Sequence, residues 1–166
     1  LFGAFLTYVP ELLDARFGSP PAVAGVVLAL ASVSSGLTAT QLGRLSTVVP
    51  TRRLVQGSLL INAGALAALP WAPASWAVGA ASLVSGVAQG LNQPALQTRL
   101  TELASDASRG VILSLNGMVL RLGQAVGPLL LGGALALGGL DAVFVAASGI
   151  ALLVGGGAVW VLRPEP

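Results

Sequence analysis

Long apolar segments, separated by short polar or proline-containing connections, dominate the hydrophobic pattern of this chain. Most of them approach or exceed the roughly 20 apolar residues that a membrane-spanning helix needs. None alternates with the period of two that is expected of a membrane strand. The first run begins at Leu1 without a methionine or a signal-peptide charge, so we expect that helix to be truncated. The pattern predicts an all-α integral membrane fold with six transmembrane helices, at about residues 1–13, 22–45, 54–71, 76–100, 110–137 and 142–162.

Composition strengthens the membrane assignment. Hydrophobic residues make up 55% of the 166 residues and charged residues only 8%, with a mean hydropathy of +0.88. Such a chain has too little polar surface to cover a water-soluble globule. All eight basic residues are arginines, most of them at the ends of apolar segments. The formal charge of +2 therefore indicates membrane topology and not binding to nucleic acid.

Several function classes lack the residues that they require. The chain has no cysteine and no histidine, so it holds no disulfide framework or thiolate site. An intramembrane serine protease at Ser34 or Ser35 would have no histidine base. Metal transport needs His, Asp or Glu inside the membrane, and a water channel would carry Asn-Pro-Ala half-helices, which Asn92-Gln-Pro94 matches poorly. We therefore expect no catalytic residue, no metal site and no cofactor.

The arginines are distributed unequally between the two ends of the predicted helices. The connections after the second, fourth and sixth helices carry six of them, whereas the opposite connections carry one. An excess of arginine marks the cytoplasmic side, and tryptophans mark the membrane interfaces. We therefore place Trp71 and Trp76 at the outer interface and Trp160 at the inner one. The cytoplasmic set is Arg44, Arg52, Arg53, Arg99, Arg109 and Arg163, and the outer set is Arg16 with Glu11, Asp14 and Asp141.

An internal similarity divides the chain into residues 1–85 and 86–166. The sequence GVVLAL from Gly25 aligns with GVILSL from Gly110, a shift of 85 residues (110 − 25), and Pro10 and Pro94 lie at nearly the same offset. Each unit holds three predicted helices, and an odd number of crossings inverts the second copy relative to the first. Inverted three-helix repeats are typical of secondary transporters.

Two predicted helices have a distinct face. Small residues on the second helix align along one side, where a neighbouring backbone approaches closely. Polar residues align along one side of the fourth helix, which must face protein or a wet cavity because unsatisfied polar groups are costly in hydrocarbon. The polar face of the fourth helix has two possible roles: it forms hydrogen bonds between helices, or it lines a cavity. The faces are Gly25, Ala29, Ser32, Gly36, Ala39 and Gly43 on the second helix, and Gly79, Ser82, Gly86, Gln89, Gln93 and Gln97, with Asn92 beside them, on the fourth.

Arg121 lies deep within the fifth predicted helix, which also carries Asn116 and Gln124. It is about eleven residues from the cytoplasmic end, or about 16 Å at 1.5 Å per residue, near the midplane of the bilayer. An unpaired arginine there costs at least about 2.5–3.5 kcal/mol, so such a residue faces the bundle or a water-filled path. Its partner is a backbone carbonyl, an amide such as Gln89 or Gln93, a group outside this chain, or a substrate. Its role is either a tie between helices or contact with substrate or a gate.

The stretch from Gln89 to Gly133 resembles the tenth and eleventh helices of major facilitator superfamily transporters of the multidrug-efflux, drug:proton antiporter type. The opening LFGAFLTYVPELL resembles the end of their seventh helix. The resemblance implies that this chain is the C-terminal six-helix half of a twelve-helix transporter. The glycines around a Gly-Pro pair are similar to the antiporter motif of the family, although one extra residue separates Pro128 from the next glycine. These residues are Gly123, Gly127, Pro128, Gly132 and Gly133.

A basic connection resembles the cytoplasmic gating loop of the family. Its matching residues are Gly43, Arg44, Arg52 and Arg53, but Thr47 or its neighbours stand where the family has an acidic residue. The arginine motif of the fourth helix of the family is also absent. Both departures favour the C-terminal half, so the resemblance implies that the proton-coupling carboxylate belongs to the N-terminal half. Glu11 is a weak substitute.

The resemblance further implies alternating access, with the first and fourth helices lining the cavity, the second and fifth flanking the other half, and the third and sixth facing lipid. The repeat aligns Gly36 with Arg121, which points the arginine at another helix near the interface between halves. Candidates for substrate contact or gating are Tyr8, Gln89, Asn92, Gln93, Asn116, Arg121 and Gln124.

The favoured function is proton-coupled efflux of drugs or other amphipathic small molecules across a bacterial or archaeal cytoplasmic membrane. The expected partners are a small-molecule substrate, protons, the lipid bilayer and the missing N-terminal six-helix half. A carrier of a sugar or another metabolite and a non-transporting scaffold half remain alternatives. If the native protein were this chain alone, a dimer of halves would replace the twelve-helix arrangement.

Overall fold

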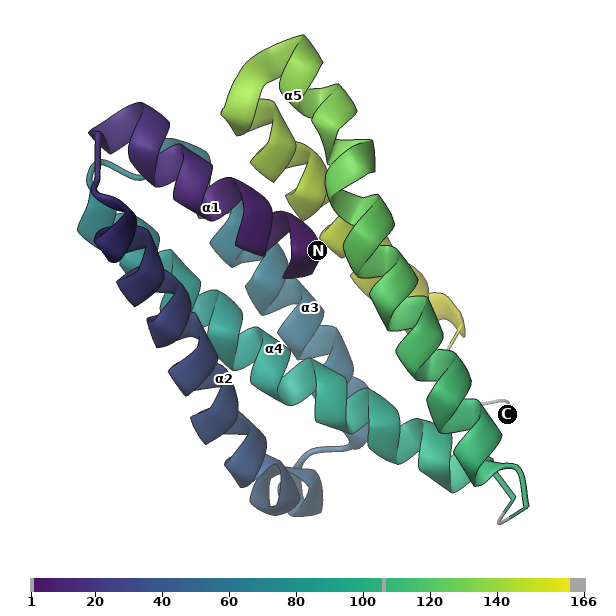
Figure 1. The fold of residues 1–166 in the computed structure, drawn as a ribbon. Helices are drawn as coiled ribbons and strands as arrows, with labels where there is room; N and C mark the ends of the chain where they lie inside the picture. Colours follow the sequence, from purple (N-terminus) through teal and green to yellow (C-terminus); the bar gives the residue numbers. More distant parts are fainter. Residues whose placement is uncertain (1, 106, 162–166) are drawn as a thin grey trace.

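The computed structural model describes residues 2–105 and 107–161, which form a bundle of helices without a strand among them (Figure 1). The predicted apolar segments are helical with nearly the expected limits. Arg163 and the side chain of Trp160 lie outside the described residues. The helices are α1 (Phe2–Phe17), α2 (Pro21–Val48), α3 (Thr51–Ala68) with the 3-10 turn η1 (Leu69–Trp71), α4 (Ser75–Leu103) and α5 (Arg109–Val161).

The long helix α5 is interrupted by two glycines. A continuous helix of 53 residues would be about 80 Å long at 1.5 Å per residue, far more than the roughly 30 Å of a bilayer core. Gly138 and Gly139 have non-helical dihedrals, and the φ of 70° at Gly139 lies in the region that favours glycine. The chain reverses there, so that α5 has a first arm (109–137) and a second arm (140–161) (Figure 1).

Prolines and a glycine set the other helix limits. Pro21 stands in the first turn of α2, and Pro50 precedes α3, where a missing N–H costs nothing. Gly18 follows α1 with a φ of 56°, and its N–H still donates to the carbonyl of Asp14 at 2.8 Å. The connections are therefore short, and neighbouring helices run in opposite directions.

By length and composition alone, three helices qualify as membrane spans, namely Pro21–Val48, Thr51–Trp71 and Arg109–Gly157. Because the broken α5 counts once, this number does not separate its two arms. Helix α1 has only 16 residues, and α4 carries several amide side chains. Six crossings arranged as two inverted repeats therefore stay a prediction.

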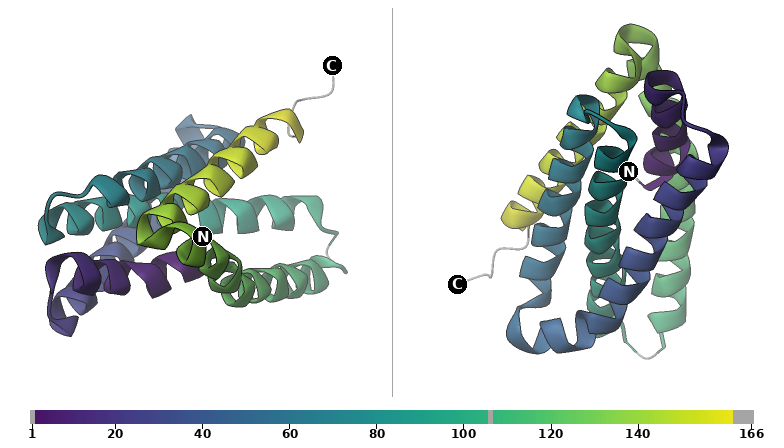
Figure 2. Two further views of the ribbon diagram at one scale, coloured as in Figure 1. Left: turned by 90° about the horizontal axis from the view of Figure 1, so that it is seen from above. Right: turned by 90° about the vertical axis from the view of Figure 1, so that its left-hand side faces the viewer.

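Helix α4 lies between α2 and α3, and α1 packs against α2 and α5. Figure 2 shows the second arm of α5 beside α3, where a Cβ at Gly155 would lie 3.4 Å from the Cβ of Leu59. The main hydrophobic core joins α1, the beginning of α2, the turn η1 and the part of α5 around its break. Its largest fully buried members include Val9, Leu12, Leu13, Leu69 and Phe144.

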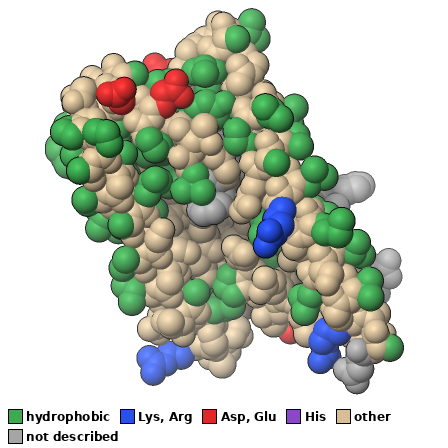
Figure 3. Space-filling model, viewed as in Figure 1, with side chains coloured by type: hydrophobic (Ala, Val, Ile, Leu, Met, Phe, Trp, Pro, Cys, Tyr) green, Lys and Arg blue, Asp and Glu red, His purple; other side chains and the backbone are tan. Residues whose placement is uncertain are grey.

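Charged side chains gather at the two ends of the bundle. Figure 3 shows acidic groups at the end where α1 turns into α2 and basic groups at the opposite end. At the acidic end, Arg16 forms an ion pair with Asp141 at 2.8 Å and also donates to the carbonyl of Pro70. Trp71 and Trp76 lie at this same end, each 73% exposed. This distribution agrees with the arginine count, whereas the orientation in the membrane stays a prediction.

Candidate functional site

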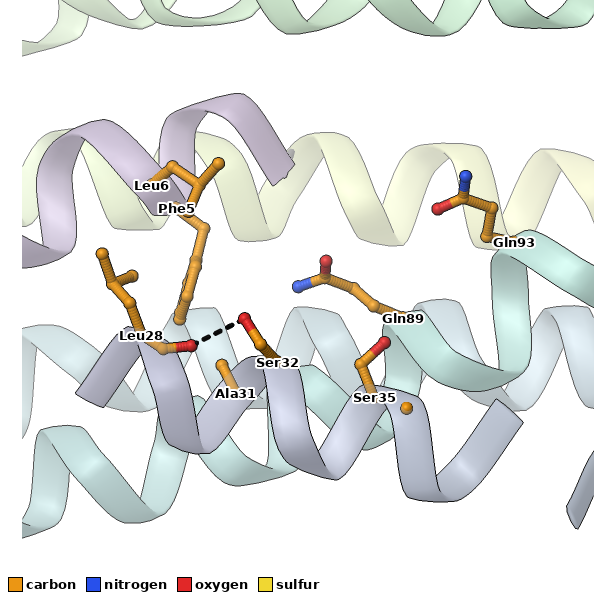
Figure 4. A pocket seen from close by; sticks show the side chains of 9 residues that line it. Phe5, Leu6, Leu28, Ala31, Ser32, Ser35, Gln89 and Gln93 are labelled. Carbon is orange, nitrogen blue, oxygen red and sulfur yellow. Dashed lines mark hydrogen bonds between the residues drawn. The ribbon is translucent and has the colours of Figure 1, made fainter. Parts of the chain in front are cut away.

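A cavity of about 340 Å³ lies between α1, α2 and α4 (Figure 4). Phe5 and Leu6 contribute its wall on α1, and the amide of Gln89 projects into it from α4. Apolar side chains and uncharged amides share the surface. The remaining lining residues are Leu28, Ala31, Ser32, Ser35 and Gly36 on α2 and Gln93 on α4.

Two glycines of α4 bring it against α2 and so determine where the glutamines lie. A Cβ at Gly86 would lie 2.9 Å from the carbonyl carbon of Ala31, and one at Gly90 would lie 3.0 Å from that of Ser35. No real side chain tolerates such distances, so the backbones touch because both residues are glycine. Gln89 follows Gly86 by three residues and therefore emerges beside the contact and into the cavity. The predicted polar face of this helix thus lines a cavity at Gln89 and Gln93.

A chain of two hydrogen bonds links Gln89 to Ser85 and then to Asn62, on the side of Gln89 away from the cavity. Gln89 Nε2 donates to Ser85 Oγ at 3.4 Å, and that hydroxyl donates to Asn62 Oδ1 at 2.7 Å. Ser85 is 1% exposed and Asn62 is 9% exposed. The sequence pattern did not predict a role for Ser85 or Asn62. The one feature that could have indicated it is the amide of Asn62 within the otherwise apolar third segment.

Asn92 faces a different helix from Gln93. It lines a smaller pocket against α3 together with Asn62 and Gln89. The step from 92 to 93 turns the side chain by about 100° around the helix, from the α3 side at Asn92 to the α2 side at Gln93. The polar face of α4 therefore serves two separate spaces, and Gln89 borders both.

Tyr8 is buried against α5 and does not line the cavity. Its hydroxyl donates to the carbonyl of Pro128 at 2.8 Å, and its side chain is 5% exposed. Pro128 has no N–H, so the carbonyl of Gln124 lacks its usual helical donor. Gly3 covers that carbonyl, since a Cβ there would lie 2.6 Å from the oxygen. The segment around Gln124 and Pro128 thus packs against α1, whereas the role of the glycines that resemble the antiporter motif stays a prediction.

Substituting Tyr8 with phenylalanine should weaken this contact without opening a cavity. The loss of one partly buried hydrogen bond is expected to lower the free energy of unfolding by about 0.5–1.5 kcal/mol. Thermal unfolding of the full-length protein in detergent measures the change. Thr7→Val is the matched control, because the exposed Thr7 hydroxyl bonds only to the carbonyl of Gly3 in its own helix. Equal midpoints for the two variants would contradict a specific role of the Tyr8 hydroxyl.

The N-terminal half of the first arm of α5 is largely uncovered. Arg121 is exposed, and it forms no hydrogen bond or ion pair with any residue that the structure describes. Asn116 is half-buried, and Gly123 has no atom within 4 Å of a built Cβ. Gly127 and Gly133 have equally open surroundings, whereas Gly132 lies near the Tyr8 hydroxyl. The predicted candidates thus fall into a cavity group, an α1–α5 contact and an open face of α5.

The residues that resemble a gating loop lie at the basic end of the bundle. Gly43 and Arg44 are exposed near the end of α2, Arg53 is exposed at the start of α3, and Arg52 is half-buried beside it. Thr47, which with its neighbours stands where the resemblance places an acidic residue, donates from Oγ1 to the carbonyl of Arg44 at 2.7 Å. The hydroxyl therefore bonds to the backbone of its own helix.

The residues that line the cavity are apolar or uncharged and polar, and no Asp, Glu or Arg is among them. The described residues include no cluster of three or more His, Cys, Asp or Glu that could hold a metal ion. Aromatic and aliphatic surface with a few amides suits the binding of a small molecule. The described residues thus form a helical protein whose long apolar helices could span a membrane and which holds a cavity suited to a small molecule, features that are typical of membrane transporters.

Comparison with known proteins gives the family. The profile described as Major Facilitator Superfamily matches residues 1–166, and the chain therefore belongs to this family of multi-pass integral membrane proteins. The chain is 28% identical over 130 residues to the multidrug resistance protein MdtG of Citrobacter koseri, covering 78% of this chain and 32% of that protein. It is 27% identical over 145 residues to the MdtG of Escherichia fergusonii, covering 87% and 35%. The chain thus spans about a third of the length of these relatives.

Proposed function

We propose that the chain is the C-terminal six-helix half of a secondary transporter that exports drugs or other amphipathic small molecules by alternating access. The observation that carries this proposal is the cavity between α1, α2 and α4, whose wall combines Phe5, Leu6 and Leu28 with the amides of Gln89 and Gln93. Apolar surface with a few uncharged hydrogen-bonding groups matches an amphipathic molecule. The printed names of the relatives, multidrug resistance proteins, support the same substrate class.

Exposed faces of α2 and α5 support a missing half. Gly25, Gly36 and Gly43 on α2 have no atom within 4 Å of a built Cβ, and neither has Gly123 on α5. Small residues on a membrane helix allow the close approach of another helix. In this proposal residues 1–85 and 86–166 form inverted repeats, and α2 and α5 contact the N-terminal half.

Protons are the proposed coupling ion, and their carboxylate lies outside the cavity described above. Glu11 and Asp14 are exposed at the acidic end of the bundle, and Asp141 is paired with Arg16. None of them lines the cavity. A carboxylate of the N-terminal half therefore takes up the proton in this proposal, and this chain contributes cargo contacts.

The cavity favours an amphipathic cargo over a sugar. A sugar needs many hydrogen-bonding groups, and an unmet hydroxyl in a buried site is costly. The hydroxyl of Ser32 already donates to the carbonyl of Leu28 at 2.9 Å (Figure 4). The two glutamines and the Ser35 hydroxyl are then the main polar groups that remain for cargo, which is few for the many hydroxyls of a sugar.

Transport by the full-length protein in proteoliposomes tests the proposal. A hydrophobic dye should accumulate in a vesicle with an acidic interior and leave when the gradient is dissipated, whereas a labelled sugar should not accumulate. Gln93→Ala should raise the KM for dye about two- to tenfold, which corresponds to one lost hydrogen bond. Gln97→Ala, one turn further along α4 and outside the cavity, is the control. Sugar uptake, or no transport of either compound, would overturn the proposal.

A further inference from the structure

A second, smaller pocket lies behind the transport cavity, between α3 and α4. Its volume is about 70 Å³, and it is lined by Ser58, Leu59, Asn62, Ala88, Gln89 and Asn92. This space is large enough for at least one water molecule. It is far smaller than the pockets that take drug-sized ligands.

The polar groups around the pocket are only partly paired. Asn62 Oδ1 accepts from Ser85, and Ser58 Oγ donates to the carbonyl of Val55 at 2.8 Å. The amide nitrogen of Asn62 and the whole side-chain amide of Asn92 find no hydrogen-bond partner within residues 2–105 and 107–161. The side chain of Gln89 forms only one long hydrogen bond, 3.4 Å from its Nε2 to Ser85 Oγ. In hydrocarbon such groups require a partner, because no bulk water reaches them.

We propose that this pocket is a binding site for ordered water, which bridges Asn62, Gln89 and Asn92 and extends to the transport cavity through Gln89. The three amides offer both donors and acceptors, as water requires. A metal cation would meet no carboxylate here, and an anion would meet no arginine, so either charge would remain uncompensated. The pocket therefore selects a small neutral molecule with both hydrogen-bonding functions.

The site gives Gln89 a partner on the side away from the cargo. Gln89 borders the pocket and the transport cavity together. Water in the pocket keeps its amide hydrogen-bonded when no cargo is present and fixes the direction in which it points. This water site concerns the bundle itself, so it is independent of the direction of transport and of the coupling ion.

Exchange of an introduced thiol with D2O tests for water directly. The chain has no cysteine, so one new thiol gives the only S–H band of this half in the infrared spectrum. Ser58→Cys places it in the pocket. Ser148→Cys is the matched control, because both serines are less than a tenth exposed and each donates to the carbonyl three residues earlier at 2.8 Å. Any cysteine elsewhere in the full-length transporter is replaced first.

In lipid nanodiscs the Ser58→Cys thiol should convert to S–D at least about tenfold faster than the Ser148→Cys thiol, because water already lies beside it. Ala88→Cys and Ala147→Cys form a second pair, each alanine 1% exposed and only Ala88 beside the pocket. Adding Asn92→Leu should slow exchange at residue 58 towards the control rate. Equal rates within both pairs would overturn the proposal.

A bound cation is the competing occupant, and the same spectra exclude or establish it. Exchange at residue 58 should be equal in sodium and choline buffers if water fills the pocket. Slower exchange in sodium alone would overturn the water site in favour of a cation. If the native full-length protein transported no dye while the Ser58→Cys thiol exchanged quickly, the proposed function would be contradicted and the water site would stand, so the two failures are distinguishable.

Discussion

Gly86→Ala is expected to separate α4 from α2 and to lower the free energy of unfolding by about 1–3 kcal/mol. The added Cβ would meet the hydroxyl of Ser34 and the carbonyl group of Ala31, closer than side chains approach in real proteins. The carbonyl belongs to the backbone of α2 and cannot turn aside. Relief requires movement of a whole helix.

The same substitution should also impair transport, because Gln89 and Ala31 line the cavity on either side of this contact. Ser34 Oγ bonds to the carbonyl of Leu83 at 3.0 Å, and a displaced α4 would break this bond between helices. Thermal unfolding of the full-length protein and dye transport in vesicles measure the two effects.

Gly79→Ala is the control within the same helix. A Cβ there would lie 3.9 Å from the nearest atom, a methyl group of Val27, which is ordinary contact. Alanine favours helix over glycine by about 0.5–1 kcal/mol, so this variant should be as stable as the native protein or more so. Gly90→Ala should resemble Gly86→Ala, because its Cβ would lie 2.9 Å from the Cβ of Thr38. If Gly86→Ala and Gly79→Ala had equal midpoints, the close packing of α2 on α4 would be wrong.

The helices were predictable because hydrophobic run length is a strong signal in membrane proteins. The break in α5 at Gly138 and Gly139 falls between the predicted fifth and sixth helices. The small-residue face of α2 illustrates the limit of such patterns. Small residues occur on both sides of that helix, and the side that packs on α4 carries Ala31 and Ser34, whereas Gly25 is exposed. Spacing alone could not choose between the two sides.

The cavity was predictable in part. Helical periodicity placed Gln89 and Gln93 on one side of α4, and the structure brings both to the cavity wall. The family resemblance also predicts Tyr8 at the cavity, because it assigns the first helix to the cavity wall. Its actual neighbour is the carbonyl of Pro128, and contacts between elements far apart in the sequence leave no periodic trace. A single buried amide such as Asn62 likewise produces no periodic pattern, so the hydrogen bonds from Gln89 through Ser85 to Asn62 could not be predicted from the sequence.

Arg121 has a role that the described residues do not explain. Its side chain is exposed on α5, and it forms no hydrogen bond or ion pair with a residue that the structure describes. The adjacent Gly123 is also open. For an arginine that the sequence predicts near the midplane and that is unpaired within the described residues, the remaining partners are the proposed N-terminal half, a water-filled path or the proposed cargo. This placement favours the gate or substrate role over a tie within the bundle.

Arg121→Ala should therefore reduce the rate of dye transport by at least about tenfold and leave the thermal midpoint of the full-length protein nearly unchanged. Loss of transport follows because a charge that contacts cargo or the opposite half contributes more than about 1.4 kcal/mol to the rate-limiting state. Stability should persist because the exposed side chain forms no hydrogen bond or ion pair within the described residues, and insertion of the helix without a charge is easier by about 2.5–3.5 kcal/mol.

Two further variants separate the charge from the space that the side chain fills. Arg121→Lys keeps the charge without the planar fork, so it should retain part of the activity. Leu122→Ala removes an exposed neighbour, 65% accessible on the same helix, and should transport normally. Retained transport with a lower midpoint in Arg121→Ala would show that the arginine ties helices together. Because the stability and transport measurements move in opposite ways under the two roles, the pair of measurements decides between them.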